Sequence, residues 1–272
     1  MFKIVSFNVN GIRARLHQIE AVQSAHHPDV LALQECKVAD EQFPLEWTQQ
    51  LGFNTAIHGQ KGHYGVALLS QTAPLQIAKG FVHDTIDAQR RFISGRYSLP
   101  RGGELTVING YFPQGEEREH PLKFPAKRQF YTDMLAHLRT NHRPDQLLAI
   151  VGDLNVAPLE NDVGIGEINA KRWLRTGKCG FLPEEREWFN TLLEWGLIDA
   201  YRAIHPDVSD QFSWFDYRSR GFEDQPRRGL RIDHILMTAP LAAQLREVGI
   251  DTAIRGMDKP SDHCPVWASF EL

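Results

Sequence analysis

The sequence predicts an α/β fold in which two mixed β-sheets pack together and helices cover their outer faces. Apolar runs with the length of strands recur along the whole chain, whereas segments with helical spacing are fewer. The two kinds do not alternate strictly, which disfavours a Rossmann fold or an α/β barrel and favours two packed sheets. Neither a GxGxxG nor a GxxxxGKS/T motif occurs, so we expect no bound nucleotide cofactor.

The expected strands are short apolar runs bounded by polar or turn-forming residues. They cover residues 4–9, 30–33, 65–69, 92–99, 105–109, 147–151, 232–237 and 265–270. The expected helices cover residues 13–25, 124–138 and 183–195, where apolar residues recur three or four positions apart. The last of these begins at Pro183 and stops at Gly196, and proline at the start and glycine after the end are typical of helices.

The chain has 272 residues, of which 42% are hydrophobic, and this is enough for one large core. Because no segment has the composition of a linker, we expect residues 1–272 to form a single domain. Cys36, Cys179 and Cys264 lie far apart, which argues against a disulfide framework and suits a reducing compartment. No run has the length of a membrane span, so we expect a cytoplasmic protein outside the membrane.

The net charge of −4 at first argues against a nucleic-acid partner, because such proteins usually carry a basic excess. The distribution of charge points the other way. Residues 171–178 contain four cations and no acid, and residues 217–231 contain five arginines against Glu223 and Asp224. These two local basic patches are suited to contact with phosphates.

Several apolar runs end in an acid or an amide, at Asn8, Glu35, Asp153 and Asp251. Taken singly, each is most simply a turn residue whose side chain bonds nearby backbone. Asp233 differs because it lies inside an apolar run, where an ionised carboxylate must find a partner. Buried strands that deliver carboxylates at their ends predict a metal-assisted active site.

The types of these residues indicate their chemistry. Glu35 is a candidate anchor for Mg²⁺, which is typically held by one or two carboxylates. If the strand continues to Asn155, then Asp153 and Asn155 project from one face; the alternative is a turn closed by the Asp153 side chain. Asp233 is a candidate partner for His263, since a carboxylate fixes the tautomer of an imidazole. A Ser-His-Asp hydrolase is set aside, because no GxSxG motif is present.

Together these segments strongly resemble the bacterial exonuclease III family over essentially the whole chain. The resemblance is carried by Asn8-Val9-Asn10-Gly11, Leu33-Gln34-Glu35, residues 109–115, Gly152-Asp153-Leu154-Asn155, residues 212–218 and Ser261-Asp262-His263. The acidic constellation is shared with the wider endonuclease/exonuclease/phosphatase superfamily, whereas residues 59–65, 172–179 and 212–218 are similar to the exonuclease III branch. The resemblance implies a four-layer α/β sandwich.

The resemblance also implies roles for matching residues. The catalytic set would be Tyr111, Asp153, Asn155, Asp233 and His263, and the Mg²⁺ set would be Glu35, Asn8 and Asp262, with Mn²⁺ as a plausible substitute. Asp153 with Asn155 would handle the proton of the attacking water or of the leaving oxygen. Tyr111 and His263, the latter oriented by Asp233, would stabilise the transition state.

A member of this family is expected to cut duplex DNA on the 5′ side of abasic sites, to remove nucleotides from 3′ ends and to trim 3′ phosphates, as a monomer. One pocket explains all three reactions, because an abasic nucleotide or a frayed end loses little stacking when it leaves the duplex. The expected DNA-binding residues are Arg91, Gln114, Lys123, Arg172, Trp214 and Leu230. Trp214 and Leu230 would line the pocket, and Arg91 with Gln114 would hold the opened duplex.

Two residues depart from the family pattern. Cys36 stands where a threonine usually follows the metal-binding glutamate, and could alter metal affinity. His234 follows Asp233 where an aliphatic residue is common, and could compete with His263 for that carboxylate. Neither departure removes a catalytic atom.

Two alternatives remain open at this point. A phosphoesterase of the same fold, acting on a small phosphorylated molecule or a lipid headgroup, would need neither the segment 172–175 nor Trp214. A nucleic-acid scaffold that has lost catalysis would show gaps in the catalytic set, and none is missing. The sequence leaves open the balance of endonuclease and exonuclease action, the number of metal ions and the group that deprotonates water.

Overall fold

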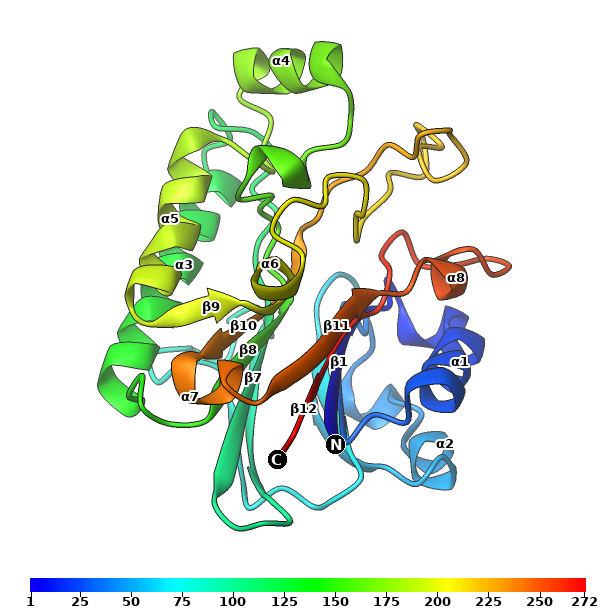
Figure 1. Ribbon diagram of the computed structural model, residues 1–272, viewed down its shortest axis with the longest axis vertical. Coiled ribbons are helices and arrows are strands. Elements are labelled where there is room, and N and C mark those ends of the chain that lie inside the picture. The colour runs from blue at the N-terminus through cyan, green and yellow to red at the C-terminus, as the bar shows by residue number, and fades with distance from the viewer.

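The computed structural model describes residues 1–272 as two six-stranded sheets that face each other (Figure 1). The first sheet has the order β11-β12-β1-β2-β4-β3, formed by Leu245–Ile250, Val266–Phe270, Phe2–Asn8, Val30–Gln34, Val66–Ser70 and Asn54–His58. The second has the order β5-β6-β7-β8-β10-β9, formed by Gln76–Lys79, Phe92–Ser98, Glu104–Tyr111, Leu148–Asp153, Asp233–Thr238 and Leu197–Asp199. Both sheets are mixed, because β1 pairs parallel with β2 and β7 with β8, while the other pairs are antiparallel.

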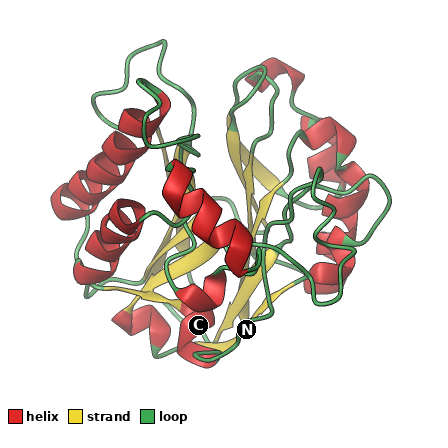
Figure 2. Ribbon diagram, turned by 90° about the horizontal axis from the view of Figure 1, so that it is seen from above, coloured by secondary structure: helices red, strands yellow, loops and turns green.

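Helices cover the outer face of each sheet (Figure 2). The helices beside the first sheet are α1 (Leu16–His26), α2 (Leu45–Gln50) and α8 (Thr252–Arg255), and those beside the second are α3 (Lys123–Asn141) and α5 (Pro183–Glu194). The remaining helices are α4 (Glu167–Thr176), which projects beyond the sheets at one end, and the short α6 (Ala200–Ile204) and α7 (Ala239–Ala242) near β9 and β10. The predicted four-layer α/β sandwich is confirmed.

Alternate residues of the central strands face different cores. In β1, Ile4 packs between the two sheets, whereas Val5 packs in the core that contains residues of α1 and α8. In β8, Val151 faces the core between the sheets and Ile150 faces the core under α3 and α5. Because both faces of these strands are buried, they carry apolar residues throughout and are recognisable in the sequence as continuous runs.

The predicted strands are all present, with ends displaced by one or two residues. The predicted helices correspond to α1, α3 and α5. The strands β3, β5 and β9, the helix α4 and the short helices α2, α6, α7 and α8 are missing from the prediction, and β11 corresponds only to the apolar run that precedes Asp251. None of the helices combines the length and the hydropathy that crossing a bilayer requires.

The two parallel strand pairs bring the candidate residues to one end of the sandwich. β1 and β2 end beside Asn8 and Glu35, and β7 and β8 end at Tyr111 and Asp153. Strands that run parallel place their carboxyl ends on the same edge of a sheet, where ligands of α/β proteins usually bind. β10 runs in the opposite direction and begins at this edge, with Asp233 opposite Asp153.

Candidate active site

A cavity of about 380 Å³ opens at this end of the sandwich. Its polar lining includes Glu35, Tyr111, Gln114, Asp153, Asn155, Lys178, Asp216, Arg218, Asp262 and His263. Its apolar lining comprises Trp173, Trp214, Leu230 and Ile232. The structure therefore brings residues of the predicted metal, catalytic and DNA-binding sets to a single cavity.

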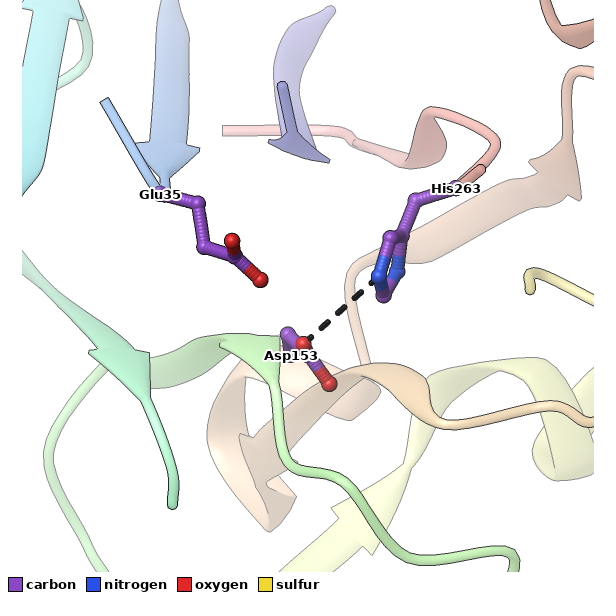
Figure 3. A group of neighbouring side chains, drawn as sticks. All are labelled: Glu35, Asp153 and His263. Carbon is purple, nitrogen blue, oxygen red and sulfur yellow. Dashed lines mark ion pairs between the residues drawn. The ribbon is translucent and has the colours of Figure 1, made fainter. Parts of the chain in front are cut away.

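Glu35, Asp153 and His263 point toward one another from three separate elements (Figure 3). Glu35 follows β2, Asp153 ends β8 and His263 precedes β12, and their ligand atoms all lie within 4.8 Å of one another. The amide of Asn8 joins the two carboxylates, because its Nδ2 donates to Glu35 Oε1 and to Asp153 Oδ2, each at 3.0 Å. This bridge holds the two acidic side chains next to each other.

His263 lies between two carboxylates. Its Nδ1 is 2.9 Å from Asp233 Oδ2, and its Nε2 is 3.8 Å from Asp153 Oδ2. Burial by itself lowers the pKa of His263, but the charges of Asp233 and Asp153 outweigh burial and raise that pKa above its ordinary value. Burial raises the pKa of Asp153, and the carboxylates of Asp233 and Glu35 add to the increase. Both groups therefore hold a proton more readily than the same side chains do in water.

β8 ends at Asp153, so of the two alternatives left open for this segment the strand that continues to Asn155 is not formed. The φ angle of Asn155 is 56°, and its backbone N–H donates to Asp153 Oδ1 at 3.0 Å, which is the turn that the sequence offered as the alternative. Asn155 Nδ2 donates to the carbonyl of Phe112 at 2.9 Å. The turn folds Asn155 back beside Asp153, and both side chains line the cavity.

Steric crowding explains why the residue before Asp153 is glycine. Gly152 lies opposite Gly110 in the parallel pair of β8 with β7, and its φ angle is 144°. A Cβ atom at Gly152 would lie 1.9 Å from the carbonyl oxygen of Gly110. The close approach of these two strands at their carboxyl ends therefore requires glycine, and it sets Asp153 at the end of the strand.

A buried ion pair fixes the turn at Asn155 from behind. Lys127 on α3 and Glu185 on α5 pair with each other, and neither side chain is exposed. Lys127 Nζ also donates to the carbonyls of Asn155 at 2.7 Å and Gln114 at 3.2 Å. Glu185 Oε2 accepts from the N–H of Gly180 at 2.7 Å. The pair was not predicted, because in the sequence both residues are ordinary charged residues of helices.

Arg91 lies behind Tyr111 and is not among the side chains that line the cavity. Its guanidinium carbon is 4.5 Å from the ring centroids of both Tyr64 and Tyr111, and Nη1 donates to the Tyr111 carbonyl at 3.1 Å. Only 8% of Arg91 is exposed. Through these contacts Arg91 supports Tyr111. The expectation that Arg91 holds an opened duplex stays a prediction. Burial raises the pKa of Tyr111 well above its usual range, so the phenol stays protonated.

An aromatic wall closes the apolar side of the cavity. Trp214 Nε1 donates to Asp262 Oδ2 at 3.0 Å, and the backbones of Trp214 and Leu230 exchange hydrogen bonds at 2.9 and 3.0 Å. Trp173 stacks on Phe181 with ring centroids 5.6 Å apart. Trp173 was not predicted as a pocket residue; its position among the cations of residues 171–178 was the available signal.

The other predicted DNA-binding residues, Gln114, Lys123 and Arg172, are exposed. Gln114 lines the cavity, and its Oε1 accepts from the N–H of Glu116 at 2.7 Å. Arg172 on α4 lines an adjoining cavity of about 140 Å³, which shares Trp173 with the first. Lys123 begins α3 and forms an exposed ion pair with Glu116.

Residues 5–263 match the endonuclease/exonuclease/phosphatase family. The chain belongs to this family. The predicted resemblance to exonuclease III is also confirmed, since the chain is 55% identical over 269 residues to exodeoxyribonuclease III of Haemophilus influenzae, covering 99% of this chain and 100% of that relative.

Solved structures of the endonuclease/exonuclease/phosphatase fold are similar over the full length. The 3′ phosphatase NExo from Neisseria, bound to a product DNA hairpin, is 35% identical, with a TM-score of 0.89 and complete coverage of both chains. An AP endonuclease from Archaeoglobus fulgidus is 32% identical, also with a TM-score of 0.89 and complete coverage of both chains. The two relatives share the arrangement of sheets and helices described above.

Both departures from the family pattern leave the cluster of Glu35, Asp153 and His263 intact. Cys36 is fully buried in the core beside α1, and burial raises the pKa of its thiol. His234 is held by the carbonyl of Val156, 2.8 Å from its Nε2, and by Arg231 Nη1, 3.0 Å from its Nδ1. His234 therefore does not compete with His263 for Asp233.

The donor set of this family member fits a hard divalent cation. Glu35 and Asp153 offer carboxylate oxygens, which such ions prefer. The Glu35 carboxylate already attracts a cation of the chain, because Lys37 Nζ lies 2.9 Å from its Oε2. Asp262 lies nearby, but both of its oxygens accept hydrogen bonds, from Asn10 Nδ2 at 2.8 Å and from Trp214 Nε1 at 3.0 Å.

Proposed function

We propose that this chain is a Mg²⁺-dependent DNA repair nuclease that cuts the phosphodiester on the 5′ side of abasic sites and removes nucleotides or phosphates from 3′ ends. One observation carries the proposal: the cluster of Glu35, Asp153 and His263 shares a cavity with the wall of Trp214 and Leu230. The cluster alone suits any phosphate ester, and the wall restricts which nucleotide reaches it. Relatives named exodeoxyribonuclease III, 3′ phosphatase and AP endonuclease support the same chemistry.

Glu35 is the main residue that would hold the cation, and Asn8 would keep the Glu35 carboxylate in place through its amide. When bound, Mg²⁺ supplies positive charge against the negative charge that grows on the phosphate. Mn²⁺ suits the same oxygen donors.

Asp153 transfers the proton in this mechanism. Its raised pKa brings the carboxyl group toward the pH at which a general acid or base is most effective. The side-chain amide of Asn8 and the backbone N–H of Asn155 each bond one of its oxygens, at 3.0 Å. Asp153 is thereby oriented to take the proton of the attacking water or to give one to the leaving oxygen.

His263 and Tyr111 donate hydrogen bonds to the phosphate oxygens. Asp233 holds the Nδ1 side of His263, so the Nε2–H faces the cavity with the positive charge that the raised pKa preserves. Burial keeps the Tyr111 hydroxyl protonated, so it can donate a hydrogen bond as well. Donors fixed in advance stabilise developing charge more than water does.

The cavity favours nucleotides that lack a base or have already lost their stacking and pairing. Its volume of about 380 Å³ is at the small end of ligand sites, which span roughly 300 to 1,000 Å³. A deoxyribose phosphate without a base enters it, whereas a base would meet Trp214 and Leu230. Extruding a normal nucleotide also costs a few kcal/mol of stacking and pairing, which an abasic site or a frayed 3′ end has already lost.

The surface beyond the cavity suits a duplex. Lys171, Arg172 and Arg175 are exposed on α4, which projects past the sheets, and they contact phosphates without reading the sequence. Lys178 follows α4 and lies over the ring of Trp173, 3.8 Å from its centroid. We also infer a monomer that acts in the cytosol, where its three free cysteines would stay reduced.

A panel of substrates separates this proposal from a phosphoesterase that acts on small molecules. With Mg²⁺, the protein is expected to cut a duplex that carries one abasic site and to remove a 3′ phosphate from a nicked duplex. Inositol phosphates should be hydrolysed much more slowly, because they lack the contacts that a duplex makes with the surface beyond the cavity. Faster hydrolysis of inositol phosphates than of either duplex would support the small-molecule phosphoesterase instead.

A further inference from the structure

Two histidines meet at the end of α3. His137 lies near the end of the helix, His142 follows its last residue, and their Nε2 atoms are 3.3 Å apart. In a tetrahedral zinc site with Zn–N bonds of about 2.0 to 2.1 Å, two nitrogens that share the ion are roughly 3.3 to 3.4 Å apart. The separation of the two imidazoles is therefore the one that a shared transition-metal ion requires.

Both imidazoles are held in place by the protein. The His137 ring packs edge-on against Phe92 with ring centroids 4.9 Å apart, and its centroid is 5.2 Å from that of His142. The backbone N–H of His142 donates to the carbonyl of Leu138 at 3.0 Å and so ends the helix. Burial lowers the pKa of both histidines, and a neutral imidazole has the lone pair that a metal ion needs.

The surroundings of the two histidines suit a cation. They line a cavity of about 450 Å³, which gives an ion room and access to water. The other charged residues of its lining, Arg96 and Glu104, pair with each other at 3.1 Å. The carbonyl groups at the end of α3 carry the partial negative charge of a helix C-terminus, which attracts cations. No unpaired cation in the lining opposes the binding of an ion.

This cavity is separate from the active site. Thr106 lines it and Tyr111 lines the active site, and both residues belong to β7. At about 3.3 Å per residue, these two positions are roughly 16 Å apart along the strand. The donors also differ in kind, because imidazole nitrogens suit zinc, copper and nickel, whereas Mg²⁺ prefers oxygen.

We propose that His137 and His142 bind a divalent transition-metal ion of the zinc class through their Nε2 atoms, with water from the cavity completing its coordination. The ion takes the place of the proton that lies between the two Nε2 atoms, and that proton moves to Nδ1 of the imidazole that carried it. The bound ion ties the end of α3 to the segment that leads to β8. The inference does not rest on the proposed nuclease function, and its tests need no nuclease activity.

Asn141 is placed to orient the His137 imidazole. Its Nδ2 lies 3.1 Å from His137 Nδ1 and donates to the His137 carbonyl at 3.0 Å. When the amide turns so that Oδ1 faces the ring, it accepts the N–H that His137 carries at Nδ1 in the metal-bound form. Acceptors in this position fix the tautomer of a metal-bound imidazole and raise its basicity.

Equilibrium dialysis of the full-length protein against Zn²⁺, in excess Mg²⁺, tests the proposal. All proteins carry Glu35→Gln, because the cluster of Glu35, Asp153 and His263 could also hold an ion. This background should bind one Zn²⁺ per chain, and adding His137→Gln or His142→Gln should weaken binding by at least about tenfold. Zn²⁺ binding that keeps its full affinity in both histidine variants would overturn the proposal.

His58→Gln is the matched control. His58 is also half-buried, but its Nδ1 bonds the carbonyl of Phe92 at 3.0 Å in place of a second imidazole. This change should leave the affinity for Zn²⁺ within about twofold, well below the 10 to 100-fold typical for loss of a supporting contact. A loss as large as that in His137→Gln would show that burial of histidine, and not the pair, determines binding, and would contradict the proposal.

A second comparison leaves both ligands in place. Asn141→Asp puts a carboxylate beside His137 Nδ1 and should strengthen Zn²⁺ binding by about tenfold. Thr140→Asp adds the same charge at an exposed neighbouring position and should have a smaller effect. An equal gain in the two variants would contradict coordination through Nε2 of His137.

Nitrogen NMR of the imidazoles locates the ion directly. Saturating Zn²⁺ should move the Nε2 resonances of His137 and His142 together and leave that of His58 in place. This measurement needs no substitution at either ligand, so it decides the question even where a histidine variant fails to fold. Unmoved Nε2 resonances of His137 and His142 would overturn the proposal.

Discussion

Asp153 and Asp233 are direct partners in the antiparallel pair of β8 with β10, and both carboxylates face the same imidazole, that of His263. Asp233 bonds Nδ1 and Asp153 lies beside Nε2. In the proposed mechanism the two acids have different roles. Asp233 orients the imidazole and favours its protonated form, and Asp153 exchanges a proton.

Replacing Asp233 by asparagine should lower kcat by on the order of 100-fold or more, the usual range for a general acid or its equivalent. Asp233 raises the pKa of His263 against the effect of burial, so its loss lowers that pKa. The alkaline limb of the pH profile should therefore move to lower pH. Asp251→Asn is the matched control, since Asp251 pairs with His26 at 2.8 Å. Equal kinetics of the two variants would refute the role of Asp233.

Breaking the buried pair of Lys127 and Glu185 should destabilise the fold. Lys127→Met leaves the Glu185 carboxylate buried without its cation, which typically costs about 3 to 5 kcal/mol of unfolding free energy. Adding Glu185→Met should recover part of that loss. Arg143→Met, which breaks an exposed pair with Asp145, should change the free energy by less than about 1 kcal/mol. Denaturant unfolding measures all of these variants, and equal losses for Lys127→Met and Arg143→Met would contradict the account.

Binding to duplex DNA should weaken steeply with salt. Each phosphate contact contributes a log-log slope of roughly −0.9 in B-form DNA, so Arg172→Ala should make the slope shallower by about that amount. Arg139→Ala is the control, because Arg139 is exposed in the last turn of α3. The slopes come from binding titrations of duplex DNA at several salt concentrations, with chelator present to prevent cleavage. An unchanged slope in Arg172→Ala would remove this residue from the DNA surface.

Stability should fall in mild acid because of His137. Burial, with a smaller effect of His142, lowers the pKa of His137 from 6.5 to about 4. The unfolded chain then binds a proton more readily than the folded chain, so stability decreases as the pH falls from about 6.5 to about 4 and is unaffected above that window. In thermal unfolding, the stability of His137→Gln should decrease less over this pH window than that of the wild type. The control His63→Gln changes an exposed histidine, and its stability should decrease as much as that of the wild type.

The sequence predicts the central strands because their burial on both faces leaves a continuous apolar pattern. β3, β5 and β9 are edge strands, and each is partly exposed, with burial patterns that alternate or remain intermediate. Edge strands gain their pairing from a neighbour on one side, so their own residues need little apolar character. α4 was missed for a related reason: none of its residues is buried.

The candidate site could be predicted in its residues and in the pairing of Asp233 with His263, but not in its other connections. Parallel strands end on one edge, so Asn8, Glu35 and Asp153 meet there, whereas Asp251 caps α8 and pairs with His26 instead. The partners of Arg91 and Asp262 could not be read in this way, because Tyr111 and Trp214 lie 20 and 48 residues away in the chain. Such contacts depend on how loops cross above the sheet, which local patterns do not encode.

The most direct test of the central claim is incision of a duplex that carries one abasic site, measured with Mg²⁺, with chelator and with the variant Asp153→Asn. The account predicts a single cut on the 5′ side of the abasic site that requires Mg²⁺ and falls by at least about 100-fold in Asp153→Asn. Cutting in the presence of chelator, or full activity of Asp153→Asn, would contradict it.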